Sequence, residues 1–284
     1  MDTTMQQGLQ ESPLCAAVFM GDFNTGKSLL INALVRHDIL FISRDESRTP
    51  PVFIARGDGG DPVFGARQKG ESTPELKSHE QFLSTRHIKG APCDSDALGA
   101  LVPDMSFRRL VFVDTPGAST DDNRPAILKP APALDNTLFV LTTTLEYWPA
   151  RHTMALIKEY HAHFPGRFVI AANMTDQMNA SEIRRVRDRA RQRLERHGVT
   201  PAPPLFPLSA RLEMARRMPG DEYRRRIKTE VRELCDAGFD AFRVALYEFE
   251  ANASPNHAEY SLDTLLTSTL ATAVTTSEKG QDAC

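Results

Sequence analysis

The segment Gly21-Asp-Phe-Asn-Thr-Gly-Lys-Ser28 stands between two apolar segments, residues 14–20 before it and residues 29–35 after it. The first is a short, continuous apolar run of the kind found in strands buried on both faces of a sheet. The second has the pattern of a helix. Glycines allow the loop between them to wrap a phosphate chain, with backbone N–H groups pointing at the phosphate oxygens. We therefore predict a strand, a phosphate-binding loop and a helix; the alternative is a glycine turn that only caps the helix.

Apolar runs farther along the chain continue the alternation of strands and helices. Further strands are predicted at residues 52–56, 62–66, 110–114, 138–142, 167–172 and 205–208, with 62–66 paired to 52–56 through the turn at 57–60. Helices are predicted at residues 150–164, at 181–197 with Ser181 as N-cap, from 220 onward, and within 262–274. We assign no elements to the mixed, polar residues 68–104. This alternation predicts an α/β fold with a doubly wound, mostly parallel sheet that binds ligands at the carboxyl ends of its strands.

The composition is that of an ordinary globular domain. Of the 284 residues, 41% are hydrophobic and 25% are charged, and the formal net charge is −3. These values argue against a disordered or fibrous chain, and the mildly acidic total gives no reason to expect nucleic-acid binding. No stretch approaches the ~18 apolar residues of a membrane-spanning helix, and residues 1–11 carry no hydrophobic signal segment. The cysteines, which form no zinc or disulfide pattern and so favour a cytoplasmic location, are Cys15, Cys93, Cys235 and Cys284.

A second motif, Asp114-Thr-Pro-Gly117, follows the strand predicted at 110–114. At the carboxyl end of a strand, Asp114 is placed to hold Mg²⁺ through water, and the Gly117 N–H is placed to meet a γ-phosphate. Within the first motif, Lys27 would bring a positive charge to the β- and γ-phosphates, and the Ser28 hydroxyl would bind Mg²⁺. Asp-Thr-Pro-Gly alone is an ordinary turn, but its place after a buried strand makes it a second indication of a nucleoside triphosphate site.

Two further motifs, Asn173-Met-Thr-Asp176 and Ser209-Ala-Arg211, complete a series. In this order the motifs resemble those of the P-loop GTPases, and within that superfamily the chain is similar to bacterial members of the dynamin family. The dynamin features are Leu-Leu-Ile-Asn-Ala-Leu after the phosphate loop, the Thr49-Pro50 pair before a strand, and the long interval from there to Asp114. The resemblance covers about residues 13–215. It implies a sheet of the P-loop NTPase type with appended C-terminal helices.

The resemblance gives the third motif a role in reading the base. Asp176 would accept hydrogen bonds from N–H groups of guanine that adenine does not offer, and Asn173 would brace the loops around the base. Ser209 and Ala210 would offer a backbone N–H to the guanine oxygen. Met174 replaces the lysine usual in the family, so the apolar cover over the base is kept while a tie to the phosphate loop is lost. The alternative is a plain helix-start turn with Asp176 as its cap.

The resemblance also provides candidates for catalysis. Thr49 would join Mg²⁺ when the γ-phosphate is present, with Ser43 and Ser47 as rivals and a simple pre-proline turn as the alternative. Ala118 stands where Ras-like proteins carry glutamine, so hydrolysis would depend on the phosphate loop, Asn24 in particular, and on a second G domain facing the nucleotide. The candidate catalytic residues are Lys27, Asn24 and Thr49, and the candidate metal ligands are Ser28, Thr49 and Asp114. The candidate nucleotide-binding residues are Gly21, Asn24, Thr25, Gly26, Lys27, Ser28, Leu29, Asp114, Gly117, Asn173, Asp176, Ser209 and Ala210.

These observations predict a protein that binds GTP and hydrolyses it to GDP and phosphate with Mg²⁺, stimulated by G-domain pairing in a homodimer or by a partner in a hetero-oligomer. Its expected parts are an N-terminal tail (1–12), a dynamin-like GTPase domain (13–215), a C-terminal helical segment (216–276) and a disordered tail (277–284). One alternative is a catalytically weak or inactive module whose interactions depend on nucleotide. Another is an ATPase with a degenerate base site.

Two weaker patterns have simpler interpretations. The arginine-rich stretches around 184–196 and 224–226 could contact anionic lipid as a peripheral membrane surface, but a solvated helix face is the simpler interpretation. His161 and His163 lack the set of acidic and cysteine partners that a metal site needs, so we expect surface histidines.

Overall fold

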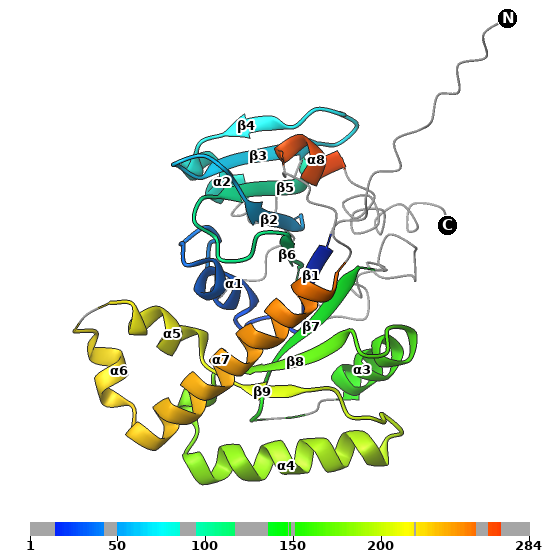
Figure 1. Cartoon of the computed structure of the whole chain (residues 1–284), viewed down its shortest axis with the longest axis vertical. Coiled ribbons are helices and arrows are strands. Elements are labelled where there is room, and N and C mark those ends of the chain that lie inside the picture. The colour runs from blue at the N-terminus through cyan, green and yellow to red at the C-terminus, as the bar shows by residue number, and fades with distance from the viewer. Residues whose placement is uncertain are drawn as a thin grey trace, which may run out of the picture.

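The computed structural model describes residues 15–42, 50–85, 95–116, 136–146, 148, 151–218, 220–253 and 261–267. Within these ranges the chain forms a nine-stranded sheet of order β4-β3-β5-β2-β6-β1-β7-β8-β9, with helices on both faces (Figure 1). The strands are β1 (Cys15–Met20), β2 (Val52–Arg56), β3 (Val63–Gln68), β4 (Glu75–Lys77), β5 (Ser95–Val102), β6 (Leu110–Asp114), β7 (Thr137–Thr144), β8 (Phe168–Asn173) and β9 (Leu205–Pro207). The helices are α1 (Lys27–Val35), α2 (His79–Thr85), α3 (Arg151–His163), the 3₁₀ turn η4 (Thr175–Gln177), α4 (Ala180–Arg196), α5 (Ala210–Arg216), α6 (Glu222–Arg226), α7 (Thr229–Asn252) and α8 (Leu262–Thr267).

The half of the sheet that contains β6, β1, β7, β8 and β9 is entirely parallel. Every residue of β1, β6 and β8 is buried, as expected for apolar runs covered on both faces. The strands predicted from these runs are confirmed to within a residue or two. Because the strands are parallel, their carboxyl ends lie along one edge of the sheet.

The other half of the sheet mixes directions, and one prediction there is wrong. Residues 62–66 do not pair with 52–56: β5 lies between β2 and β3, parallel to β2 and antiparallel to β3. The inserted strand has the sequence Ser-Asp-Ala-Leu-Gly-Ala-Leu-Val, whose alanines and glycine give little strand signal. Its small side chains fit between covering layers, and its backbone needs a hydrogen-bonded neighbour on each side. The link at 57–60 therefore carries the chain past β5 instead of forming a tight hairpin.

Alternating residues of the central strand β1 point into two core layers. On one face Phe19 packs in a cluster with residues of α1, α2 and α5, such as Leu30. On the other face Val18 packs in a cluster with residues of α3, α4 and α8, such as Ile157 and Ile183. The sheet is thus covered on both sides, as predicted for a doubly wound fold.

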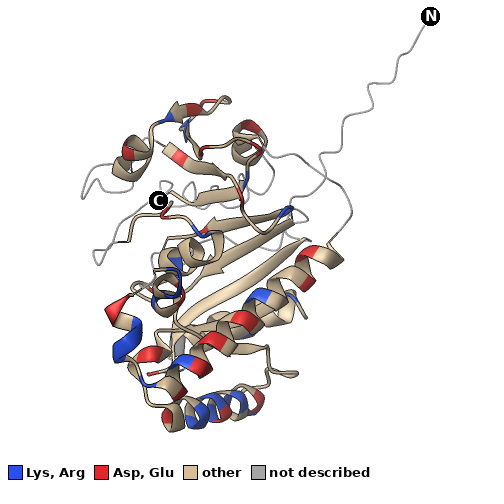
Figure 2. Ribbon diagram, turned by 60° about the vertical axis from the view of Figure 1, so that its left-hand side comes forward, with Lys and Arg blue, Asp and Glu red and all other residues tan. Residues whose placement is uncertain are grey.

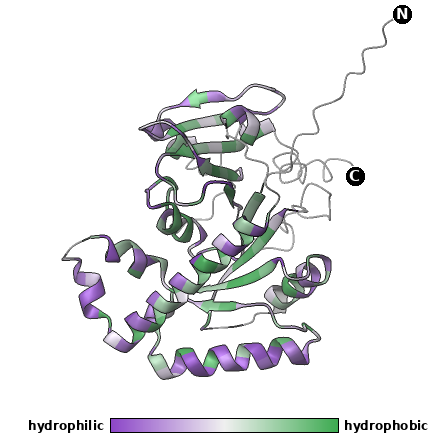
Figure 3. Cartoon of the chain, in the orientation of Figure 1, coloured by the Kyte–Doolittle hydropathy of each residue, from purple (hydrophilic) through white to green (hydrophobic). Residues whose placement is uncertain are grey.

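Helix α4 has the single apolar stripe predicted for it: its buried residues are Ala180, Ile183, Ala190 and Leu194. Most of its other residues are hydrophilic and exposed (Figure 3). The expected N-cap was wrong, because the helix begins earlier. Asn179 is the N-cap: its side chain accepts from the Glu182 N–H at 2.9 Å, and the Glu182 carboxylate accepts from the Asn179 N–H at 3.1 Å. This reciprocal pair satisfies N–H groups at the helix start, and Ser181 only donates its hydroxyl to Asn179.

The C-terminal helices pack on the same sheet. Helix α7 packs against the edge strand β9 and contributes to both core layers, with Cys235 on one side and Phe242 on the other. Helix α8 lies over β3 and β5 at the far end of the sheet. The predicted tails, 1–12 and 277–284, and the part of the final predicted helix beyond Thr267 lie outside the described residues. None of the helices in the described ranges is long and apolar enough to cross a membrane.

Candidate functional site

The motif segments meet at the carboxyl edge of the parallel half-sheet. The phosphate-loop motif follows β1, Asp114 ends β6, Asn173 ends β8, and Ser209 follows β9. Residues far apart in the sequence are therefore brought to one place by strand order alone, which is where open α/β sheets bind ligands.

The phosphate-loop segment is held closely between its neighbours. Gly21 has a φ of 140°, and a Cβ there would lie 2.1 Å from the carbonyl oxygen of Thr142 on β7. Gly26 has a φ of 79°, and a Cβ there would lie 2.5 Å from Nδ2 of Asn173 on β8. A side chain at either position would clash, so these close approaches require glycine. Asn24 has a φ of 58°, a left-handed conformation that asparagine tolerates better than most residues.

Lys27 begins α1 and is buried although it is charged. Its ammonium donates hydrogen bonds to the carbonyl oxygens of Gly21 at 3.0 Å and Asp22 at 2.9 Å. The Thr25 hydroxyl donates to the same Asp22 oxygen at 2.9 Å. The loop thus curves around a buried cation, and a cation enclosed by backbone groups at a helix start attracts anionic ligands such as phosphate.

Two candidate metal ligands meet beside this loop. The Ser28 hydroxyl donates to Oδ2 of Asp114 at 2.7 Å, although the two residues are 86 positions apart. The Thr115 hydroxyl anchors the end of β6 by donating to the carbonyl oxygen of Phe19 at 2.8 Å. A hydroxyl and a carboxylate are hard oxygen donors, and Mg²⁺ characteristically takes one or two such protein oxygens together with phosphates and water. The donor set therefore fits Mg²⁺.

Asn173 connects the phosphate loop to the segment after β9. Its Nδ2 donates to the carbonyl oxygen of Thr25 at 3.0 Å and, with longer geometry, to that of Gly26 at 3.4 Å. Its Oδ1 accepts from the Ala210 N–H at 3.0 Å. The Ser209 hydroxyl accepts from the Leu212 N–H at 3.1 Å and so caps α5. The Ala210 N–H, expected to face a guanine oxygen, is thus used inside this brace, and its contact with a base stays a prediction.

Asp176 lies in η4, directly after β8, and only 7% of its surface is exposed. The η4 turn is anchored to its neighbours: the Thr175 N–H and hydroxyl both donate to the carbonyl oxygen of Leu208, at 3.2 and 2.9 Å. Met174 has a φ of 62°, and its methyl carbon would lie 3.3 Å from a Cβ at Gly26. The methionine thus lies against the phosphate loop, and its role as an apolar cover over a base stays a prediction.

A tyrosine that the sequence did not single out contacts Asp176. The Tyr223 hydroxyl, on α6, donates to Oδ2 of Asp176. The guanidinium of Arg211, on α5, lies 3.7 Å from the centre of the Tyr223 ring. No motif or spacing marks Tyr223, because it reaches the site only through the packing of α6 beside η4.

Buried thiols lie near the core of the domain. Cys235, on α7, lies 3.2 Å from the Thr175 hydroxyl below the η4 turn. Burial raises the pKa of Cys235 to about 11 and that of Cys15 to about 12, so both are thiols, not thiolates, at neutral pH. Both cysteines are free.

Several predicted residues cannot be placed. Thr49, its rivals Ser43 and Ser47, and Gly117 and Ala118 lie outside the described residues. The structure therefore brings together the phosphate loop, Asp114, Asn173, Asp176, Ser209 and Ala210, and the roles of Thr49 and Gly117 stay predictions.

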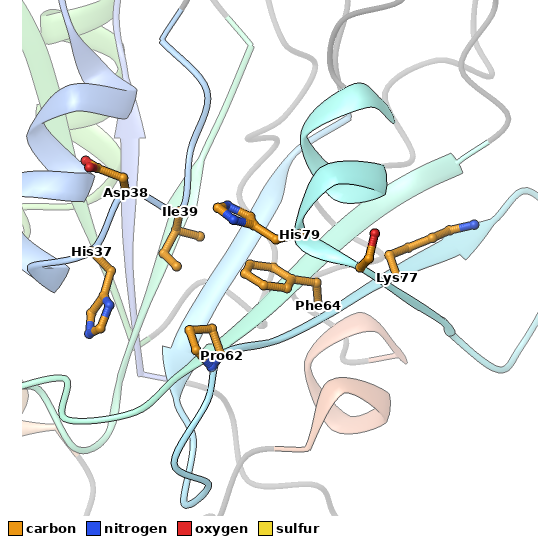
Figure 4. Close-up of a pocket in the computed structure, with 8 residues that line it drawn as sticks. His37, Asp38, Ile39, Pro62, Phe64, Lys77 and His79 are labelled. Carbon is orange, nitrogen blue, oxygen red and sulfur yellow. The ribbon is translucent and has the colours of Figure 1, made fainter.

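A hollow of about 490 Å³ lies elsewhere, beyond the C-terminal end of α1 (Figure 4). It is lined by His37, Asp38, Ile39, Pro62, Phe64, Lys77, Ser78 and His79. The rings of Phe64 and His79 are stacked with centroids 4.7 Å apart. No predicted site residue lines this hollow, and the phosphate loop lies at the opposite end of the helix.

The arginines of α4 form a basic outer face (Figure 2). Some of them have acidic neighbours on the same helix, as in the Arg191–Glu195 pair at 3.2 Å. Among the described residues, no cluster of three or more His, Cys, Asp or Glu side chains could hold a metal ion. His161 and His163, on α3, are at least partly exposed, as expected.

Comparison with known proteins shows the fold. No protein-family model and no curated protein sequence matches the chain. Two chains from structures of an oligomerised bacterial dynamin pair, described as a mechanism for long-range sensing and tethering of membranes, align with 84% of this chain and 36% of their own length. Their sequence identities are 11% and 12%, with TM-scores of 0.50 and 0.53. An Aquifex aeolicus Era variant with bound GDP and AlF₄⁻ aligns at a TM-score of 0.35, with 16% identity, over 70% of this chain and 52% of its own.

The chain spans about a third of the length of the dynamin-pair structures, which cover 84% of it. Together with the sheet order, the likeness shows a P-loop NTPase type of α/β fold that continues into C-terminal helices.

Proposed function

We propose that this chain is a GTPase that binds GTP with Mg²⁺ and hydrolyses it to GDP and phosphate. The observation that carries the proposal is the Asn173 side chain, which bonds to the phosphate loop on one side and to Ala210 on the other. Since Asn173 lies three positions before Asp176, this brace supports a site in which the loop would hold phosphates and Asp176 would read the base. A plain helix-start turn at 173–176 does not explain why Asn173 is bonded to two distant loops.

The phosphate end would act through Lys27 and the loop N–H groups. The Lys27 ammonium would leave the carbonyl oxygens of Gly21 and Asp22 to bind the β- and γ-phosphates. Ser28 and Asp114 would hold Mg²⁺, with Thr49 as the third expected ligand. When bound, Mg²⁺ would offset the charge that develops on the phosphates during transfer.

The base end would select guanine through Asp176. A carboxylate accepts hydrogen bonds only, and guanine offers N–H donors on the edge where adenine has none to match. With only 7% of Asp176 exposed, an adenine base would leave acceptors without donors away from water. This accounts physically for a preference for guanine.

Hydrolysis would be assisted by a second protein surface. Asn24, in its left-handed turn, would orient water or a bridging oxygen, and a facing G domain or a partner subunit would complete the site. The dynamin-pair structures, which are oligomers that tether membranes, support pairing and peripheral membrane association as part of this proposal. The basic face of α4 is available for an anionic surface. We propose no nucleic-acid partner, and the free thiols of Cys15 and Cys235 support a cytoplasmic location.

Within this proposal the GTPase domain comprises residues 13–215 and the helical segment residues 216–276. Helix α7 of this segment packs against β9. A conformational change at the nucleotide site would therefore be transmitted to the helical segment.

Calorimetry and phosphate release test the proposal together. With Mg²⁺ present, we expect heat on titration with GTP, weaker competition by ATP, and phosphate release per molecule that rises with protein concentration. The absence of heat with either purine triphosphate would refute the site.

A second candidate function is a nucleotide-dependent interaction module without significant hydrolysis. Met174, which offers no ammonium to the phosphate loop, favours this candidate. Tight GTP binding without phosphate release, at any protein concentration in single- and multiple-turnover assays, would establish the module and reject the enzyme.

A further inference from the structure

Helix α6 is held to the site by polar contacts. It contains no buried residue, yet its Tyr223 donates a hydrogen bond to Asp176, 47 positions earlier. This contact adds a fourth segment to the base end, after the ends of β8 and β9 and the η4 turn. A hydroxyl bonded to the side chain that would read the base is placed to affect which base is accepted.

We propose that Tyr223 is a positioning residue for guanine specificity, whose hydroxyl holds the Asp176 carboxylate in the orientation that accepts the N–H groups of guanine. The inference rests on the proposed function, because it takes Asp176 as the residue that reads the base.

The hydrogen-bonding capacity of a carboxylate favours support over competition. An ionised carboxylate has about four lone-pair positions on its two oxygens. Tyr223 uses one of them on Oδ2, and the two N–H donors of guanine would use two more. The tyrosine and the base can therefore bond to Asp176 at the same time. Because the hydrogen bond from Tyr223 already restricts the orientation of the carboxylate, less side-chain conformational entropy is lost when guanine binds.

Tyr223 is itself fixed from several sides. The Arg211 guanidinium lies over its ring at 3.7 Å from the centroid, a cation–π contact. The Tyr223 N–H donates to Asp221, the N-cap of α6, at 2.7 Å. The next residue, Arg224, bonds to both carboxylate oxygens of Asp236 on α7, one of them at 3.0 Å. These contacts leave the hydroxyl little freedom to turn away from Asp176.

The protonation state of Tyr223 suits a donor. Burial, and then the hydrogen bond and negative charge of Asp176, raise the pKa of Tyr223 to about 12. The phenol is therefore protonated throughout the physiological range, and it donates to the carboxylate without repelling it.

The test compares Tyr223→Phe with a matched control, Tyr247→Phe. Tyr247, on α7, packs its ring on Phe107 at a centroid distance of 4.5 Å and belongs to the opposite core layer. Both variants remove one phenolic oxygen and keep the ring. Affinities for GDP, inosine diphosphate and ADP are measured by calorimetry with Mg²⁺. Inosine diphosphate lacks the exocyclic amine and so reports on one of the two guanine donors alone.

We expect Tyr223→Phe to weaken GDP binding about tenfold, to weaken inosine diphosphate binding less, and to leave ADP binding unchanged. Tyr247→Phe should match the wild type with all three ligands. Arg211→Met, which keeps the hydroxyl but removes the cation over the ring, should give a smaller loss that is also confined to GDP and inosine diphosphate.

Three results with Tyr223→Phe would overturn the inference while the proposed function stands. The first is an unchanged affinity for GDP. The second is tighter GDP binding, which would mean that the tyrosine competes with the base, and the third is an equal loss of affinity for GDP and ADP, which would mean a structural role only. A wild-type chain that does not prefer GDP to ADP would instead refute the proposed base reader. The measurements on Tyr223→Phe therefore test the inference, and the measurements on the wild-type chain test the proposed base reader.

Discussion

The proposed phosphate end and the proposed base end of the site are built from different kinds of contact. The phosphate end is one continuous segment, residues 21–28, and its shape is set by backbone conformation and by close approach to β7 and β8. The base end is assembled from separate segments: the side chain of Asn173 at the end of β8, Asp176 in η4, the backbone N–H of Ala210 at the start of α5, and Tyr223 on α6. A change at the first end should therefore affect every nucleotide alike, whereas a change at the second should affect the choice among bases.

Lys27→Ala should have the largest effect, and it should not discriminate between bases. The variant removes the ammonium that the loop encloses, so we expect GTP and ATP binding to fall at least ~1000-fold, about 4 kcal/mol from lost charge-assisted hydrogen bonds. Calorimetry with Mg²⁺ measures the loss. The control is Lys158→Ala, which removes an exposed ammonium on α3. Wild-type affinity in Lys27→Ala would show that the phosphate end has been misplaced.

Asn173→Ala tests whether the two ends depend on one another. The variant removes the bonds to the Thr25 oxygen and the Ala210 N–H and leaves both groups buried without this partner. We expect a fall of about 3 kcal/mol in the free energy of unfolding and weaker binding of both GDP and ADP, with the larger loss for GDP.

Asn32→Ala is the matched control for Asn173→Ala. Asn32 is also buried, and its side chain bonds to both the N–H and the carbonyl oxygen of Leu40, at 2.9 and 2.8 Å. It should lose similar stability in denaturant unfolding while keeping the wild-type ratio of GDP to ADP affinity. If the two variants changed that ratio equally, Asn173 would have no special part in joining the two ends.

Asp176→Asn should change base preference and little else. An asparagine keeps one acceptor but replaces the other with an N–H₂ group, which opposes the donors of guanine. The ratio of GDP to ADP affinity should fall by about 30-fold, close to 2 kcal/mol, with ADP binding and stability nearly unchanged. Asp188→Asn, on the exposed face of α4, is the control. An unchanged ratio in Asp176→Asn would contradict the assignment of the base reader.

The difference between the two ends also explains what the sequence could predict. The phosphate end is local: its glycines, lysine and serine lie within eight positions, between a buried strand and a helix, so pattern alone locates it. Asn173 and Asp176 were found because they follow a strongly apolar strand. Tyr223 was not found, since its contact with Asp176 depends on how α6 packs, and no local pattern encodes that packing.

The strands of the fold also differ in whether local sequence or distant neighbours determine them. The apolar runs of β1, β6, β7 and β8 are strong signals because these strands are buried on both faces, and parallel order then follows from the alternation with helices. The strand β5 carries alanines and a glycine, with weak intrinsic preference, and it forms because β2 and β3 supply neighbours on both sides. The nearby turn at 57–60 suggests a pairing of 62–66 with 52–56, which is wrong because the distant strand β5 lies between these two segments.

Met174→Lys should have the smallest effect, and it sharpens the comparison because it would join the two ends by a second route. The Met174 methyl carbon lies near Gly26, so a lysine in the same left-handed position has an ammonium long enough to reach the carbonyl oxygens of the phosphate loop. One partly exposed charge-assisted bond, less the entropy of ordering the side chain, should tighten GDP binding about threefold, or ~0.6 kcal/mol.

Met218→Lys is the control, because it adds the same charge at an exposed position and should leave the affinity unchanged. Fluorescence titration with a labelled guanine nucleotide resolves a threefold change. Because the lysine ties the base loop to the phosphate loop only when both are in place, the gain should disappear in Asn173→Ala; a gain of equal size there would show that the added charge attracts phosphate without linking the ends.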